Sequence, residues 1–194
     1  NHRHASKNPK AQYPFPVELE TVLKSSCVAS PLHLFDCSPI TDGAAAGIFS
    51  SQPGDVEICA SQIATDSVSL TERESLVEFK ATKLAAQKAY LQAGVGPANI
   101  DLAEVHDCFS IAEIMAIEDL GFCSKGEGAK KIKNGDFDHD GHLPVNLSGG
   151  LKACGHPVGA TGVKQVVEIF DQLCGRAGAR QVKQAKIGLT HNVG

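Results

Sequence analysis

Apolar positions recur with helical or strand spacing in several segments of the chain. The clearest helical stripe lies in residues 75–93, where apolar side chains return every three or four positions and Gly94 closes the pattern. Residues 110–120 and 159–173 carry similar stripes and predict two more helices. Short apolar runs bounded by turn residues predict strands at residues 32–35, 56–64, 101–105, 145–147 and 186–189.

The order of these elements alternates strand and helix, which predicts an α/β fold with helices packed on a sheet. Residues 1–30 are polar and marked by prolines, with a short helix expected near residues 16–25. We interpret that stretch as a linker and not as core. Residues 121–143 form a glycine-dotted polar excursion.

Cys108 lies between a predicted strand and the helix expected to begin near Ser110. Ser110 and Glu113 have the spacing of a capping box. A thiol just before a helix N-terminus meets free N–H groups and the positive end of the helix dipole, and both favour the thiolate. Cys108 is therefore expected to be reactive, the alternative being a small buried residue.

Further polar side chains stand in comparable places. His106 follows the same predicted strand, and His156 lies between Gly155 and Pro157, directly before a helix. That setting favours an imidazole presented to a site. The glycine spacing is neither the dinucleotide fingerprint nor a phosphate loop. The pair His191-Asn192 ends the last strand, where it either faces a site or caps a turn.

Composition narrows the function classes. The 194 residues carry a net charge of −4 without a basic block, so nucleic acid is not an expected partner. No apolar stretch approaches the roughly 20 residues that span a bilayer. Seven cysteines without a Cys-x-x-Cys pair indicate free thiols in a reducing compartment. Residues 136–147 resemble a calcium loop but end in leucine where glutamate belongs, so no metal is expected.

Several motifs, in the right order, resemble those of thiolases. Residues 143–162, which contain the Gly-His-Pro triplet, are similar to the corresponding thiolase region. His106-Asp107-Cys108-Phe109 resembles the variant, typical of sterol-carrier-protein-2-type thiolases, of a loop that reads Asn-Glu-Ala-Phe in most members. Residues 1–9, 38–45 and 191–194 match the same subfamily.

The resemblance implies a thiolase-like fold built from two similar halves. This chain would contain the C-terminal βαβαβαββ half, with helices packed on a mixed five-stranded sheet. Residues 1–53 would be the end of the loop region and the tail of the N-terminal half, and residues 54–194 the C-terminal thiolase domain. We expect the chain to be part of a longer protein, whose N-terminal half carries the nucleophilic cysteine and which forms a homodimer or a larger assembly.

The resemblance also implies CoA-dependent thiolytic cleavage of 3-oxoacyl-CoA, or the reverse Claisen condensation of acyl-CoA. His156 would activate the nucleophile, and His106 would hold a water that completes the oxyanion site. Cys108 would be the second acid/base, because the loop His191-Asn192-Val193-Gly194 has no cysteine where most thiolases have one. That loop would support the oxyanion site, and Ser38 would contact CoA.

Two alternatives remain open at the level of sequence. One is a ketoacyl-synthase-like condensing enzyme, and the other is a non-catalytic thiolase-like subunit that binds acyl-CoA as a scaffold. No cofactor is implied beyond the coenzyme A thioester that serves as substrate. The expected location is the cytoplasm, or the peroxisome in a eukaryote, and the chain alone is expected to be inactive.

Overall fold

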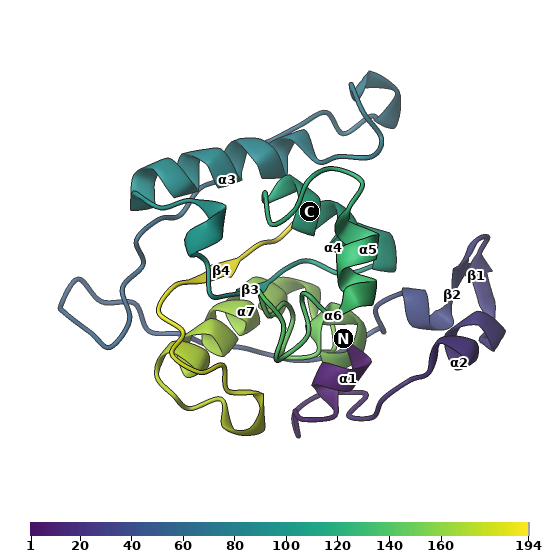
Figure 1. Ribbon diagram of the computed structural model, residues 1–194, viewed down its shortest axis with the longest axis horizontal. Coiled ribbons are helices and arrows are strands. Elements are labelled where there is room, and N and C mark those ends of the chain that lie inside the picture. The colour runs from purple at the N-terminus through teal and green to yellow at the C-terminus, as the bar shows by residue number, and fades with distance from the viewer. Residues whose placement is uncertain (194) are drawn as a thin grey trace.

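The computed structural model describes residues 1–193 and centres on two parallel strands, β3 (Leu102–Glu104) and β4 (Gly188–Thr190). The three residues of β3 pair with the three of β4 in register. Val145 extends this arrangement through a parallel bridge to Ala103. In Figure 1, β4 is the yellow arrow that runs beside β3. These strand ends position the loops that carry the candidate chemistry.

Three longer helices surround the strands: α3 (Lys80–Ala93), α4 (Ser110–Asp119) and α7 (Val158–Leu173). Helix α7 packs against both β3 and β4, and α3 packs against α4 (Figure 1). The shorter elements are α1 (His2–Ala5), α2 (Leu19–Lys24), α5 (Gly128–Asn134), α6 (Gly150–Cys154) and the antiparallel hairpin β1 (Cys27–Ala29) and β2 (Leu32–His33).

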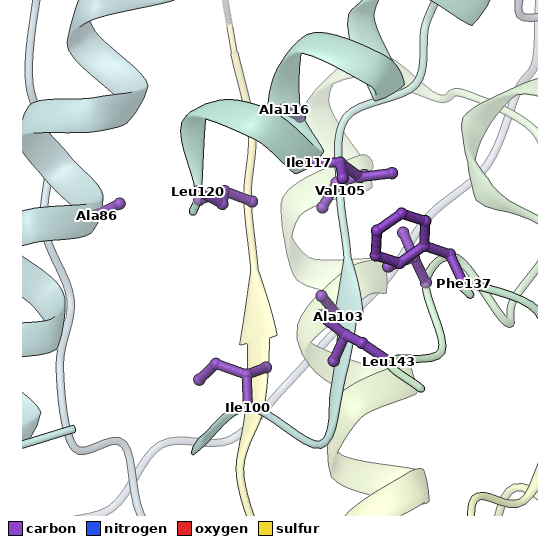
Figure 2. Packing of buried hydrophobic residues seen from close by; sticks show 10 residues of the cluster. Ala86, Ile100, Ala103, Val105, Ala116, Ile117, Leu120, Phe137 and Leu143 are labelled. Atoms are coloured by element: carbon purple, nitrogen blue, oxygen red, sulfur yellow. The ribbon is translucent and has the colours of Figure 1, made fainter. Parts of the chain in front are cut away.

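Alternate residues of β3 face opposite sides, as expected for a strand. On one side, Ile169 of α7 packs directly against Gly188 of β4. A Cβ at position 188 would collide with the Ile169 side chain, so glycine is required for this contact. On the other side lies the main apolar core, shown in Figure 2. Its buried members are Ala86, Ile100, Ala103, Val105, Ala116, Ile117, Leu120, Phe137, Leu143 and Val145.

The α/β pattern and the long helices predicted from sequence are confirmed. Helices α4 and α7 begin within one residue of the expected positions, whereas α3 begins at Lys80 and not at residue 75. The strand predicted at residues 56–64 is wrong. Ile58 and Ile63 are 58% and 84% exposed there, because no sheet edge among the described residues lies alongside to bury their apolar face.

The five-stranded sheet is likewise not found within residues 1–193. The strands form two separate two-stranded sheets, one antiparallel and one parallel. Residues 145–147 contribute the single bridge at Val145 instead of a strand. The polar excursion at residues 121–143 contains helix α5, which the sequence pattern did not reveal.

The first residues are packed and not a linker, which corrects the interpretation of residues 1–30 for their N-terminal part. Ala5 and Ala11 are buried with Ala153 of α6 in a small cluster of alanines. Gly149 allows this approach, since a Cβ there would lie 2.7 Å from the Ala5 Cβ. Throughout residues 1–193, helices long and apolar enough to cross a bilayer are absent.

Candidate active site

The loop after β3 carries His106, Asp107 and Cys108 and is fixed by buried hydrogen bonds. Asn146, itself completely buried, accepts a hydrogen bond from the Val105 N–H at its Oδ1, 2.8 Å away. Two residues after Cys108 the chain enters α4. The loop therefore has little freedom on either side of its three polar residues.

Asp107 ties this loop to helix α6. Its carboxylate accepts hydrogen bonds from the Leu151 N–H at 2.6 Å, from the Lys152 N–H at 3.3 Å and from the Asn1 side-chain amide at 2.5 Å. Gly150 makes this possible, because a Cβ there would collide with the Asp107 carboxylate. Burial, with the nearby Glu113 carboxylate, raises the pKa of Asp107.

Sequence reasoning assigned no role to Asp107. The glycine pair Gly149-Gly150 at the start of α6 is a usable signal in the sequence, because adjacent glycines mark a position where another group can approach the backbone closely. Helix α6 leads directly into Gly155 and His156. Asp107 thus joins the two loops that carry the candidate histidines.

His156 sits between α6 and α7 and is held at both its backbone and its ring. Its N–H donates to the Thr41 Oγ1 at 3.0 Å, and its Nδ1 lies 2.7 Å from the Thr161 Oγ1. The Thr161 hydroxyl can donate its single hydrogen to the Pro157 carbonyl, 3.1 Å away, and then accepts from His156. In that arrangement the His156 Nδ1 carries the proton and Nε2 presents a lone pair.

His106 and His156 are brought together from different parts of the chain. Their ring centroids lie 5.2 Å apart, with the rings perpendicular. Burial lowers the pKa of both imidazoles, and for His156 the neighbouring His106 and Lys164 lower the pKa further. The His106 Nδ1 lies 3.3 Å from the Asn192 Oδ1. The pair is thus predominantly neutral at physiological pH.

Cys108 is half-buried beside the segment that contains Ser38. The Ser38 N–H donates to the Cys108 carbonyl at 2.8 Å, and Cys37 pairs with Phe109 in an isolated bridge. Burial raises the pKa of the Cys108 thiol, and the Asp107 carboxylate raises it further. The expectation that the helix start favours a thiolate is wrong, because desolvation and this negative neighbour outweigh the backbone N–H groups of Cys108 and Phe109, which lower the pKa.

The predicted capping box at the start of α4 is wrong as well. Ser110 donates its hydroxyl to the Asp36 carboxylate at 2.7 Å instead of capping the helix. Glu113 accepts hydrogen bonds from the side-chain amides of Asn1 at 2.8 Å and Asn146 at 3.1 Å. Partners distant in sequence have replaced the local ones.

His191 and Asn192, which follow β4, contact different parts of the structure. Asn192 lies against His106 as described, whereas the His191 Nε2 lies 2.9 Å from the Thr82 Oγ1 of α3. Burial lowers the pKa of His191 to about 4. Gly194 lies outside the described residues.

An open groove lies beside His156 at the start of α7. Its volume is about 400 Å³, and its walls come from residues 41–45 and 157–160. Within residues 1–193, groups of three or more His, Cys, Asp or Glu side chains suited to a metal ion are absent. The arrangement thus offers a protonated thiol, two neutral imidazoles and an adjacent groove, which suits acid–base chemistry on a bound substrate.

Comparison with known proteins adds a family context. Residues 63–194 match the family model described as thiolase C-terminal domain-like. The whole chain is 50% identical, over 203 aligned positions, to an acetyl-CoA acetyltransferase of Methanothermobacter thermautotrophicus and covers 52% of that protein. It is 41% identical over 206 positions to sterol carrier protein 2 of Rattus norvegicus, of which it covers 38%. The chain therefore spans about half the length, or less, of these curated relatives.

A solved structure supports the fold. The structure described as an Ltp2-ChsH2(DUF35) aldolase superimposes with a TM-score of 0.81, covering 97% of this chain and 52% of the other. The two sequences are 24% identical, so this likeness speaks for the fold alone.

Proposed function

The chain belongs to the thiolase family, and from that premise we propose that it forms the C-terminal half of an enzyme that cleaves 3-oxoacyl-CoA with CoA or runs the reverse condensation. The observation that carries the proposal is the perpendicular contact of His106 and His156, 5.2 Å apart, with Cys108 in the same loop as His106. Curated relatives named acetyl-CoA acetyltransferase support the reaction class.

In the proposed mechanism, His156 is the base for the nucleophile. Its Nδ1 is engaged by Thr161, so Nε2 is free to take the proton of a cysteine thiol supplied by an N-terminal thiolase half. The resulting thiolate attacks the 3-keto carbon, the bond between C2 and C3 breaks, and the electron pair passes to the enolate of acetyl-CoA. The thiol of a second CoA then takes the acyl group from the enzyme.

Cys108 is the acid that protonates C2 of that enolate. The raised pKa of its thiol supports this role, because the proton stays on sulfur until a much stronger base forms beside it. In the condensation direction the thiolate that remains after this proton transfer is the base, and it takes a proton back from C2 of acetyl-CoA. The thiol is thus needed for proton transfer at C2 and not for transfer of the acyl group to CoA.

His106 holds a water that donates to the thioester oxygen, where negative charge develops. Asn192 supports His106 from the last loop. We propose that CoA lies along the groove beside His156, with Ser38 close by, since Ser38 is anchored to Cys108 and one groove wall begins three residues later, at Thr41.

The whole protein is proposed to be a homodimer or larger assembly that contains both thiolase halves. The seven free cysteines favour a reducing location such as the cytoplasm, or the peroxisome in a eukaryote. No cofactor beyond the CoA substrate enters the mechanism.

A fusion enzyme tests the proposal. The N-terminal portion of the Methanothermobacter relative, which this chain does not cover, is joined ahead of Asn1, and cleavage of acetoacetyl-CoA is followed with CoA present. We expect CoA-dependent cleavage that falls about 10²–10⁴-fold in Cys108→Ala. Cys123→Ala, a thiol packed against the main core, is the matched control and should change the rate less than about twofold.

The intact archaeal enzyme serves as the control for activity, and circular dichroism shows whether the fusion is folded. A folded fusion that lacks cleavage while the archaeal parent is active contradicts the proposed function and favours a non-catalytic subunit. If the cleavage rate fell equally in Cys108→Ala and Cys123→Ala, Cys108 would not be the acid in the reaction.

A further inference from the structure

We propose that Gln165, on α7, is a positioning residue that acts through Asn192 to hold His106 protonated at Nδ1. The inference rests on the proposed function for its catalytic meaning, but its geometry and its test do not depend on activity. Neither the sequence pattern nor the family match assigns this glutamine a role.

The link consists of two successive side-chain contacts. Gln165 is completely buried, and its Oε1 accepts a hydrogen bond from the Asn192 Nδ2 at 2.5 Å. The Asn192 Oδ1, at the other end of the same amide, lies 3.3 Å from the His106 Nδ1. The Asn192 amide packs beside Gly162 of α7, where a Cβ would lie at an ordinary contact distance of 3.5 Å from its nitrogen.

The direction of the first contact determines the second. A side-chain amide has one donor end and one acceptor end. When the donor end of Asn192 is directed at Gln165, the acceptor end faces His106, so the His106 Nδ1 must carry hydrogen. Because the imidazole is neutral, its Nε2 then has a lone pair and no proton. His106 is therefore set to accept a hydrogen bond within the site, as His156 is through Thr161.

A second observation concerns the amide nitrogen of Gln165. Its Nε2 is buried and has no partner among residues 1–193. An unpaired buried donor lowers stability, so an apolar residue would be a simpler choice at this position. The carbonyl end, in contrast, makes the contact to Asn192, and this favours a role for Gln165 as an oriented acceptor.

For the proposed reaction, this tautomer matches the task of His106. A water that donates one hydrogen to the Nε2 lone pair is held in place and turns its other hydrogen to the thioester oxygen. If both amides were reversed, Asn192 would donate to His106, and the proton would reside on Nε2. The two arrangements differ in the position of one hydrogen, which nitrogen NMR measures directly.

The test is magic-angle-spinning NMR of this chain with ¹⁵N-labelled histidine, which is insensitive to molecular size. The His106 signals are identified by their loss in His106→Gln. The parent should show His106 protonated at Nδ1. In Gln165→Met, which removes the acceptor and conserves volume, the ratio of the Nδ1–H to the Nε2–H tautomer should fall about fivefold, the size expected for one net hydrogen bond.

Gln172→Met is the matched control. Gln172 is a second buried glutamine of α7, but it bonds to the Arg180 carbonyl and the Val182 N–H, remote from the histidines. Its loss should lower stability without changing the His106 tautomer. Asn192→Leu breaks the same link from the other end and should reproduce the effect of Gln165→Met, which covers the case that the latter fails to fold.

An Nε2–H tautomer in the parent would overturn the inference, as would a ratio that stays unchanged in both Gln165→Met and Asn192→Leu. Because the readout needs no catalysis, the two proposals fail separately. An inactive fusion enzyme with a Gln165-dependent tautomer would reject the function and keep the positioning role. An active fusion in which the His106 tautomer ratio does not depend on Gln165 would keep the proposed function and reject the positioning role.

Discussion

Replacing Glu104 by glutamine should make the chain more stable, relative to the parent, as the pH rises. Glu104 is the last residue of β3 and is almost completely buried on the α7 side of the strand. Its carboxylate accepts hydrogen bonds from the Ser148 N–H at 3.0 Å and the Ser148 hydroxyl at 2.6 Å. Burial, with the nearby Glu168 carboxylate, nevertheless raises the pKa of Glu104 to about 7.

The sign follows from where the proton resides. Below pH 4.5, Glu104 is protonated in both the folded and the unfolded chain. As the pH rises from 4.5 to about 7, the unfolded chain ionises while the folded chain keeps its proton, so stability falls. The total loss is about 3 kcal/mol, of which about 2.5 kcal/mol develops between about pH 5 and pH 8. Glutamine has no proton to lose and resembles the protonated acid in shape.

The assay is urea unfolding of the parent and Glu104→Gln at pH 5 and pH 8, followed by circular dichroism at two protein concentrations. The difference in the free energy of unfolding, variant minus parent, should increase by about 2.5 kcal/mol between these pH values. Glu57→Gln, at an exposed glutamate, is the matched control and should show no such increase. A pH-independent difference for Glu104→Gln would refute the reasoning.

Three further outcomes are expected. In the fusion enzyme, Cys108→Ala should keep acyl transfer but lose deuterium exchange at C2 of acetyl-CoA by about 10²–10⁴-fold, and exchange at the parental rate would make Cys108 a packing residue. The chain alone should self-associate through exposed apolar side chains of residues 40–79, and a monomer by light scattering at high concentration would contradict this. Gly150→Ala should lower the free energy of unfolding by more than about 2 kcal/mol in the same urea assay, because the new methyl group clashes with Asp107 and the backbone φ of +63° strains an alanine. Gly126→Ala is the control: it has a φ of +84° but open space around it, and it should cost about 1 kcal/mol.

The elements with strong local signals were predictable from the sequence. The stripes in α4 and α7 and the short run before His106 have the expected positions, and the thiolase-like fold implied by the motifs is confirmed. The strand predicted at residues 56–64 failed because alternation alone does not supply a neighbouring strand. Local periodicity reports which face of an element is apolar, but not what covers it.

The site was predictable in its parts but not in its connections. The motifs indicated His106 and His156, and the structure places them in contact. Asp107 was missed because its partners, the N–H groups of Leu151 and Lys152, lie more than forty positions further along the chain. The capping box failed for the same reason, since a tertiary carboxylate took the serine hydroxyl that local spacing assigned to the helix.

The protonation states of the site form a consistent set. Burial lowers the pKa of His106 and His156 and raises that of Cys108, so each is held in its neutral form. Under the proposed mechanism, negative charge appears only briefly, on the thioester oxygen and on C2. A Cys108 poised as a thiolate would have no proton to give to C2, and it would repel the enolate. The raised pKa therefore fits an acid in the cleavage direction better than the reactive thiolate that the helix start predicted.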